Sequence, residues 1–459
     1  MATLAEIDAL RDTDRSAALE GYAALQDRIA VNDAERILWL ADQVAPPPPP
    51  ELGRLFARVS DAGDAPLRRA AEHAQATIAW FAGRREEAEL RWSRCMHAAD
   101  RDRVWIRTCL SLSMALGARG CLFEPVVLSG LGARAAADLG EPYLEAYAAF
   151  ARASLLLDMG DTARAEAAAR DGSEAAAAVR CPGRGRVVAY MRFDVRADLH
   201  QARGALDQAL LEREKQLAWL KGHGAGQGPV LAEVHGRLLA LRYELEPSRR
   251  RSTLAAIARL PDTYRLGPGW AGDGLRDLLL LRLRDAVERG AAAEARKTAR
   301  SLLDDLAADR HASRRVRTAT RVALSLAPLE DDEGLARKAL ELASQASLLR
   351  ILVAARVTRE IPALAHATTE DWEILRAYRE HLRAEQQAVL ETVATVLEPG
   401  VASLEFLVED GSLSICAWCQ GVRTAHDTWL PLAHYVPTDT AFAVSHGICP
   451  ACVGQYFDA

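Results

Sequence analysis

Apolar residues recur at helical spacing through most of the chain, and turn-prone residues interrupt them at a regular interval. In residues 205–221, for example, apolar positions lie three or four apart, as on one face of an α-helix. The interruptions fall at Gly83, Asp100, Gly120, Gly140, Gly160, Gly183, Gly204, Gly226, Pro247, Gly269, Gly290 and Asp309. From Gly160 onward they are 19 to 23 residues apart. One helix per interval, and two helices per repeat of roughly 40 residues, predicts an α-solenoid.

A small residue at a fixed place after the turn supports helical pairs. An alanine stands five positions after the turn glycine at Ala88, Ala165, Ala209, Ala295 and Ala339. Pro125 and Pro247 break the pattern. A small side chain there lets the second helix of a pair pack closely on the first. The segment M-G-D-T-A-R-A-E-A at 159–167 resembles the tetratricopeptide repeat family. That resemblance implies helical hairpins over residues 1–368, with a protein or peptide bound on the concave face.

Composition agrees with a mainly α chain of more than one unit. With 459 residues, the chain exceeds the size at which a single hydrophobic core keeps growing. Half of the residues are hydrophobic, but only 6% are aromatic, and alanine and leucine dominate. These residues favour helices over strands.

Residues 369–399 form the longest helical pattern without an interruption. Its apolar positions follow an approximate heptad: Leu375, Tyr378, Leu382, Val389 and Val396. A heptad of this kind predicts a connector helix that pairs with a second copy, which would make a homodimer through residues 369–397. A helix that covers the last repeat fits the same pattern.

The composition changes to a β pattern at residue 400, and the last 60 residues contain two C-x-x-C pairs. The pairs are Cys416/Cys419 and Cys449/Cys452, separated by 29 residues. Two thiolates three positions apart on a tight turn bind one metal ion, and two such turns supply the four sulfurs of a tetrahedral site. Residues 400–459 are therefore predicted to be a small β-containing, zinc-ribbon-like domain with one zinc ion on these four cysteines.

The same residues resemble a C-terminal tail found on bacterial two-component signalling proteins. The core of the resemblance is I-C-x-x-C followed by S-H-G-I-C-P-x-C, and the matching positions are Ile415, Cys416, Cys419, Val422, Arg423, Trp429, Leu432, Tyr435, Ser445, His446, Gly447, Ile448, Cys449, Pro450 and Cys452. The chain departs from that tail at Gln420-Gly421 and at Ala433-His434. The resemblance covers about 45 residues and implies a role in bacterial signalling.

Two alternatives concern the metal. Rubredoxins hold iron with a similar layout of two C-x-x-C pairs, so an iron protein that transfers electrons or senses redox state is the second hypothesis. Iron is less favoured because Gly421 and Gly454 stand one place later than the rubredoxin glycines. His446, three residues before Cys449, is a further candidate ligand, although two complete C-x-x-C pairs favour four cysteines.

Several classes of partner and activity are not expected. The net charge is −6, and residues 401–459 carry one basic residue, Arg423, against six acidic ones, so nucleic acid is not expected. The first residues lack the apolar segment of a signal peptide, and no apolar stretch is long enough to span a membrane. Together with the metal-spaced cysteines, this predicts a cytoplasmic protein. No spacing typical of a catalytic nucleophile and base occurs. The sequence therefore predicts a non-catalytic adaptor.

Overall fold

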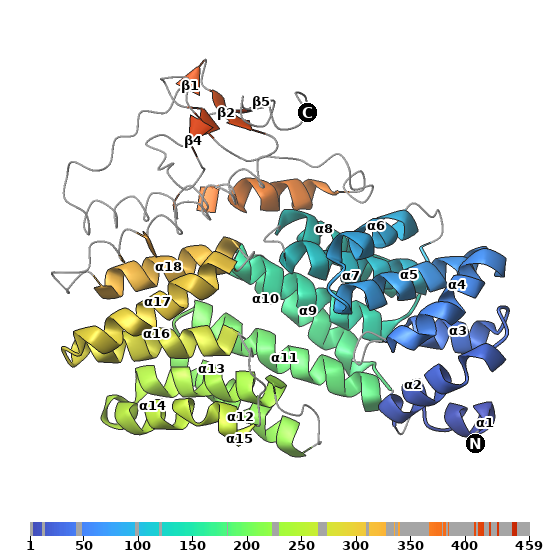
Figure 1. The fold of residues 1–459 in the computed structure, drawn as a ribbon, viewed down its shortest axis with the longest axis horizontal. Coiled ribbons are helices and arrows are strands. Elements are labelled where there is room, and N and C mark those ends of the chain that lie inside the picture. Colours follow the sequence, from blue (N-terminus) through green and yellow to red (C-terminus); the bar gives the residue numbers. More distant parts are fainter. Residues whose placement is uncertain are drawn as a thin grey trace, which may run out of the picture.

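The computed structural model of the chain is mainly helical, with short strands near the C-terminal end (Figure 1). It describes residues 3–11, 14–42, 48–96, 101–118, 122–180, 182–222, 229–264, 273–308, 312–326, 335, 338–339, 367–378, 380–381, 384, 408–409, 412–416, 422–423, 429–430 and 443–447. For these residues the predicted mainly α class is confirmed.

The α-helices of the described part are short to medium in length. In chain order they are α1 (Leu4–Asp8), α2 (Arg15–Ala24), α3 (Ala34–Ala41), α4 (Gly53–Ala62), α5 (Ala65–Phe81), α6 (Arg85–Met96), α7 (Arg103–Ala118), α8 (Phe123–Asp138), α9 (Pro142–Asp158), α10 (Thr162–Ala177), α11 (Pro182–Ala202), α12 (Leu206–Gly222), α13 (Pro229–Leu245), α14 (Arg250–Ala258), α15 (Leu260–Thr263), α16 (Asp273–Glu288), α17 (Ala292–Ala308) and α18 (Ala312–Leu326). Three 3-10 turns accompany them: η1 (Gln26–Arg28), η2 (Pro50–Leu52) and η3 (Pro247–Arg249). No described helix has both the length and the apolar character needed to cross a bilayer.

Helices that follow one another in the chain pack together, as α7, α8, α9 and α10 do (Figure 1). Alternate helices also touch: α3 contacts α5, α5 contacts α7, α7 contacts α9, and α9 contacts α11. Farther along the chain, α13 contacts α16 and α16 contacts α18. We call α3, α5, α7, α9, α11, α13, α16 and α18 the alternate row.

Five of the turn glycines predicted from the sequence have a left-handed backbone. Gly83, Gly140, Gly160, Gly204 and Gly290 have φ between 65° and 81°, a region that favours glycine because it has no Cβ. Each turn closes the preceding helix with the same two hydrogen bonds. At the first, the Gly83 N–H donates to the Trp80 carbonyl at 3.0 Å and the Arg84 N–H donates to the Ala79 carbonyl at 2.9 Å. This is the Schellman pattern of a helix C-terminus.

The alanines predicted to lie at the helix–helix contacts are fully buried. Ala88, Ala165, Ala209, Ala295 and Ala339 all have 0% relative exposure. The first four lie in α6, α10, α12 and α17, the helices that follow four of the left-handed turns. The pattern of a turn glycine followed by a buried alanine is thus confirmed at these four positions, whereas Gly334, before Ala339, lies outside the described residues. Cys95 and Cys109 are also buried, whereas Cys121 and Cys181 lie outside the described residues.

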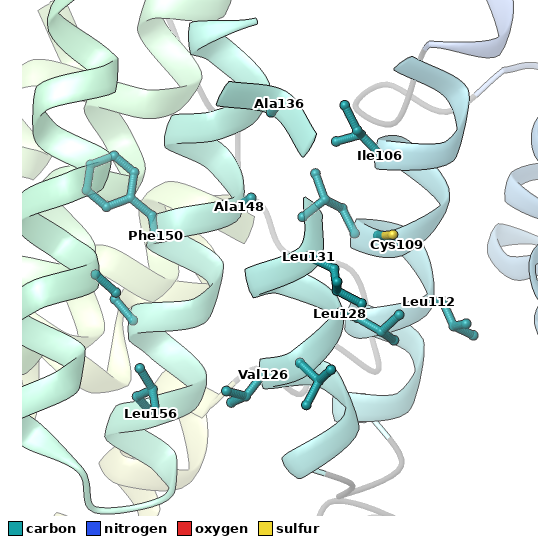
Figure 2. Close-up of a cluster of buried hydrophobic side chains, with 14 of the residues drawn as sticks. Ile106, Cys109, Leu112, Val126, Leu128, Leu131, Ala136, Ala148, Phe150 and Leu156 are labelled. Atoms are coloured by element: carbon teal, nitrogen blue, oxygen red, sulfur yellow. The ribbon is translucent and has the colours of Figure 1, made fainter. Parts of the chain in front are cut away.

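Buried apolar side chains form several clusters along the chain instead of one centre. One cluster joins α1 to α5, the largest extends from α5 to α11, and another joins α16 to α18. Figure 2 shows part of the largest cluster, where Ile106 of α7, Leu128 of α8 and Phe150 of α9 lie in the core. Local clusters of this kind let a chain of this length bury its apolar surface without one oversized core.

One described segment packs on helices that are distant from it in the sequence. Residues 369–378 are helical and pack back on the largest cluster, where Ile374, Leu375 and Tyr378 are at most 3% exposed. The Trp372 ring lies 5.5 Å from the ring of Phe123 in α8. This segment therefore belongs to the helical body.

Charged groups hold residues 369–378, which we call the returning segment, on the helical body. The buried Asp371 carboxylate accepts hydrogen bonds from the Thr368 backbone N–H and hydroxyl, both at 2.8 Å. It also faces Arg152 of α9 at 3.4 Å. Glu373 pairs with Arg164 of α10 at 3.3 Å.

The returning segment changes the prediction for residues 369–399. Its described part lies on α8, α9 and α10, whereas most of the last predicted repeat is outside the described residues. Leu375 and Tyr378, the first two heptad positions, are buried within the same chain, so they are not available to a second copy. Leu382, Val389 and Val396 lie outside the described residues.

Replacing Asp371 should release this segment. Asp371→Ala removes the carboxylate that caps the helix and the buried partner of Arg152, so we expect local opening to become easier by about 2 kcal/mol. Amide hydrogen exchange of residues 369–378 should accelerate by more than tenfold. Glu373→Ala on the same helix is the control, because Glu373 is half exposed and its ion pair contributes little. Equal acceleration in both variants would contradict the assigned role of Asp371.

The strands near the C-terminal end form one small sheet. They are β1 (Val408–Glu409), β2 (Ser412–Cys416), β3 (Val422–Arg423), β4 (Trp429–Leu430) and β5 (Ala443–Gly447). β1, β2, β3 and β4 pair in that order as antiparallel neighbours, and β5 pairs with β2 in parallel.

Candidate functional site

One of the predicted metal ligands lies at the end of a described strand. The first predicted ligand, Cys416, is the last residue of β2, and residues 417–421, which contain Cys419, connect β2 to β3. Cys416 is in register with Gly447, the last residue of β5. Because β2 and β5 are parallel, their carboxyl ends share one edge of the sheet. Cys449 follows Gly447 by two positions.

The described residues do not place the other predicted ligands. Cys419, Cys449 and Cys452 lie outside the described residues, and no group of three potential metal ligands occurs among the residues that are described. His446 lies in β5 in register with Ile415. The assignment of zinc to the four cysteines remains a prediction from their spacing.

A second candidate site is a cavity in the helical body that the sequence did not predict. Its volume is about 440 Å³, and residues of α3, α5, α7 and α11 line it. These four helices all belong to the alternate row. Among the lining residues are Leu38, Trp39, Pro66 and Val104, which give the cavity an apolar side.

The charged side of the cavity is centred on Asp42, directly after α3. A carboxylate at a helix C-terminus is disfavoured by the helix dipole, so it requires cations nearby. Three guanidinium groups provide them. The Arg107 Nε donates to Asp42 Oδ1 at 2.7 Å, and Arg103 and Arg184 donate to Oδ2 at 3.2 and 3.3 Å. We call these four residues the Asp42 cluster.

Helix geometry and an aromatic ring position the cluster. Arg103 and Arg107 are four residues apart in α7, so they lie on one face of that helix. Tyr143 of α9 lies below two of the cations, with its ring centroid 5.2 Å from the Arg107 guanidinium carbon and 5.4 Å from that of Arg184. Burial alone would raise the pKa of Asp42, but the charges of Arg107 and Arg103 outweigh it and lower that pKa below its ordinary value. The cluster is therefore fully charged near neutral pH.

His73 of α5 is the buried neutral group beside the cluster. Its Nδ1 lies 3.0 Å from the Thr108 hydroxyl, and that hydroxyl donates to the Val104 carbonyl at 2.9 Å. Since the Thr108 proton is already used, Nδ1–H must be the donor, which leaves Nε2 as an acceptor. Burial, and then the charge of Arg107, lower the pKa of His73 to about 4. The imidazole is thus neutral at pH 7.

The sequence carries one signal for this site. Arg107 is the only charged residue in the apolar run of residues 104–116. An arginine inside an apolar helix face requires a buried partner. The partner could not be identified because Asp42 lies 65 residues earlier and Arg184 acts on it from 142 residues away.

Comparison with known proteins gives no match: neither a family model, nor a curated protein, nor a solved structure is similar to the chain.

Proposed function

We propose that the chain is a non-catalytic adaptor for protein–protein interaction in bacterial signalling or regulation. Its helical body is an α-solenoid of tetratricopeptide-like pairs that binds a protein or peptide segment on the face of the alternate row. Its C-terminal residues hold one structural zinc ion on Cys416, Cys419, Cys449 and Cys452.

One observation supports this proposal above the others. The same left-handed glycine turn recurs at five places along the chain, and at four of them a fully buried alanine stands five positions after the glycine. A repeated helical pair builds an extended surface, which suits binding of another chain better than it suits a single reaction centre.

Site-specific crosslinking tests the adaptor role. Met114 in α7 is 41% exposed and belongs to the alternate row, whereas Leu90 in α6 is 55% exposed and does not. A photoreactive amino acid at position 114 should capture one discrete protein in the native cells, and the same group at position 90 should capture less of it. Capture that is equal at both positions, or absent at both, would contradict the proposal.

Metal content tests the C-terminal part. We expect about one zinc ion per chain, no visible colour, and loss of the zinc in Cys449→Ser, because three thiolates do not complete a tetrahedral site. Elemental analysis and absorption spectra of protein purified under reducing conditions measure this. Cys95→Ser is the control, because Cys95 is buried in the helical body. Stoichiometric iron with thiolate–iron absorption would instead support the redox alternative, and intact protein without metal would refute both.

A further inference from the structure

The cavity beside the Asp42 cluster has an excess of positive charge. Among the residues that line it, four arginines stand against three carboxylates: Arg11, Arg103, Arg107 and Arg184 against Glu35, Asp42 and Asp102. One positive charge is left over.

Three of these guanidinium groups share one carboxylate. Arg107, only 6% exposed, donates to Asp42 Oδ1, and Arg103 and Arg184 both donate to Oδ2. An anion bound beside them accepts from guanidinium N–H groups that Asp42 does not use. Planar guanidinium groups bind the two oxygens of a carboxylate well.

One hydrogen-bonding atom of the cavity residues points to the same kind of ligand. The Nε atom of Arg103 is buried and has no hydrogen-bond acceptor among the described residues, and a carboxylate oxygen can accept from it. Buried polar groups of this kind are rare and call for an explanation such as a ligand.

The remaining wall is apolar and partly open. Leu38 is 41% exposed although it is a large hydrophobic residue, and Trp39, Pro66 and Val104 lie beside it on the cavity wall. The volume of about 440 Å³ lies within the range of small-molecule sites. It is small for a folded partner, whose contact would bury about 800 Å² on each side.

We propose that this cavity binds a small organic monoanion, a carboxylate on an apolar body. The carboxylate lies among Arg103, Arg107 and Arg184, and the apolar body packs on Leu38 and Trp39. A single excess charge matches one carboxylate better than the dianion of a phosphate ester. Because its ligand bridges α3, α7 and α11, binding ties together helices that are far apart in sequence. This site goes beyond the adaptor function and depends on neither the zinc nor the protein partner.

Matched pairs of probes test the proposal on the full chain. The acids are phenylacetate, 3-phenylpropionate and hexanoate, each beside its primary amide, which has the same shape without the charge. Inorganic phosphate is a separate probe. Ligand-detected NMR measures binding, and thermal unfolding measures the accompanying stabilisation. We expect at least one acid to bind at least tenfold more tightly than its amide and more tightly than phosphate.

Two variants and one control locate the binding. Arg184→Gln should weaken acid binding at least tenfold, and its thermal unfolding without ligand shows whether it folds. Leu38→Ala, at a partly exposed position, should weaken the phenyl acids and leave the fold intact. Arg282→Gln, beside a different cavity between α14 and α16, should change nothing. The proposal is overturned if no acid binds, if acid and amide bind alike, if phosphate binds more tightly, or if Arg184→Gln binds the acids unchanged.

Discussion

Asp42→Asn is expected to lower the free energy of unfolding of the N-terminal helices by about 3–5 kcal/mol. This is the usual cost of removing one member of a buried ion pair, because the charge that remains is left without its partner. The substitution keeps the shape of the side chain and removes only its charge. Three guanidinium groups from α7 and α11 would then face each other around a neutral amide.

Urea unfolding followed by circular dichroism measures this loss. Asp61→Asn in α4 is the control, because Asp61 is exposed, and it should change the unfolding midpoint little. The pH dependence has a definite sign. Since the pKa of Asp42 is lowered in the folded state, its contribution is present above the unfolded pKa and is lost as the pH falls through the folded pKa. If Asp42→Asn lowers the free energy of unfolding by less than about 1 kcal/mol, water screens the charges of the Asp42 cluster.

Between pH 6.5 and pH 4, the chain should lose about 3 kcal/mol of stability through His73 alone. The pKa of His73 falls from an ordinary 6.5 to about 4 on folding. In this window the unfolded chain binds a proton and the folded chain does not, so the free energy of unfolding decreases as the pH falls, by about 1.4 kcal/mol for each pH unit. Two charged groups act on the imidazole: Arg107 lowers its pKa, and Asp42 raises it by a smaller amount.

The difference between wild type and His73→Gln isolates this effect. Unfolding free energies at pH 7.0, 6.0 and 5.0 should fall less steeply in the variant, because glutamine does not titrate. His235→Gln is the comparison. The pKa of His235 is also lowered, by burial and then by Lys221, but this residue is only about half buried. Its removal should therefore reduce the pH dependence of the unfolding free energy by less. Parallel curves for wild type and His73→Gln would show that His73 is protonated as easily in the folded chain as in the unfolded one.

Local features of the fold were predictable from the sequence, because they depend on residues close together. Gly83, Gly160, Gly204 and Gly290 were predicted as turns from spacing alone, and the structure places them in the left-handed region. A helix that ends in a sharp turn requires glycine there for steric reasons, so sequence and geometry are directly linked.

The distant contacts were not predictable for the opposite reason. Nothing near Asp42 in the sequence indicates that Arg107 and Arg184 will meet it, since their meeting depends on how α3, α7 and α11 stack. The heptad of residues 369–378 predicted a surface for another helix, but periodicity does not say which helix. The surface is used within the same chain, on α8, α9 and α10. The four-cysteine site rests on spacing alone, because only Cys416 lies among the described residues.

The returning segment also has a consequence for how the chain is made. Ala177 ends α10, and Tyr378 completes the cluster that α10 belongs to, so about 200 residues must be synthesised between the two. At typical rates of translation this takes roughly 10–40 s. During that time α8, α9 and α10 have left the ribosome without Ile374 and Leu375, and the apolar surface that these residues cover remains exposed. We therefore expect the newly made N-terminal half to be a substrate for chaperones until translation has passed residue 378.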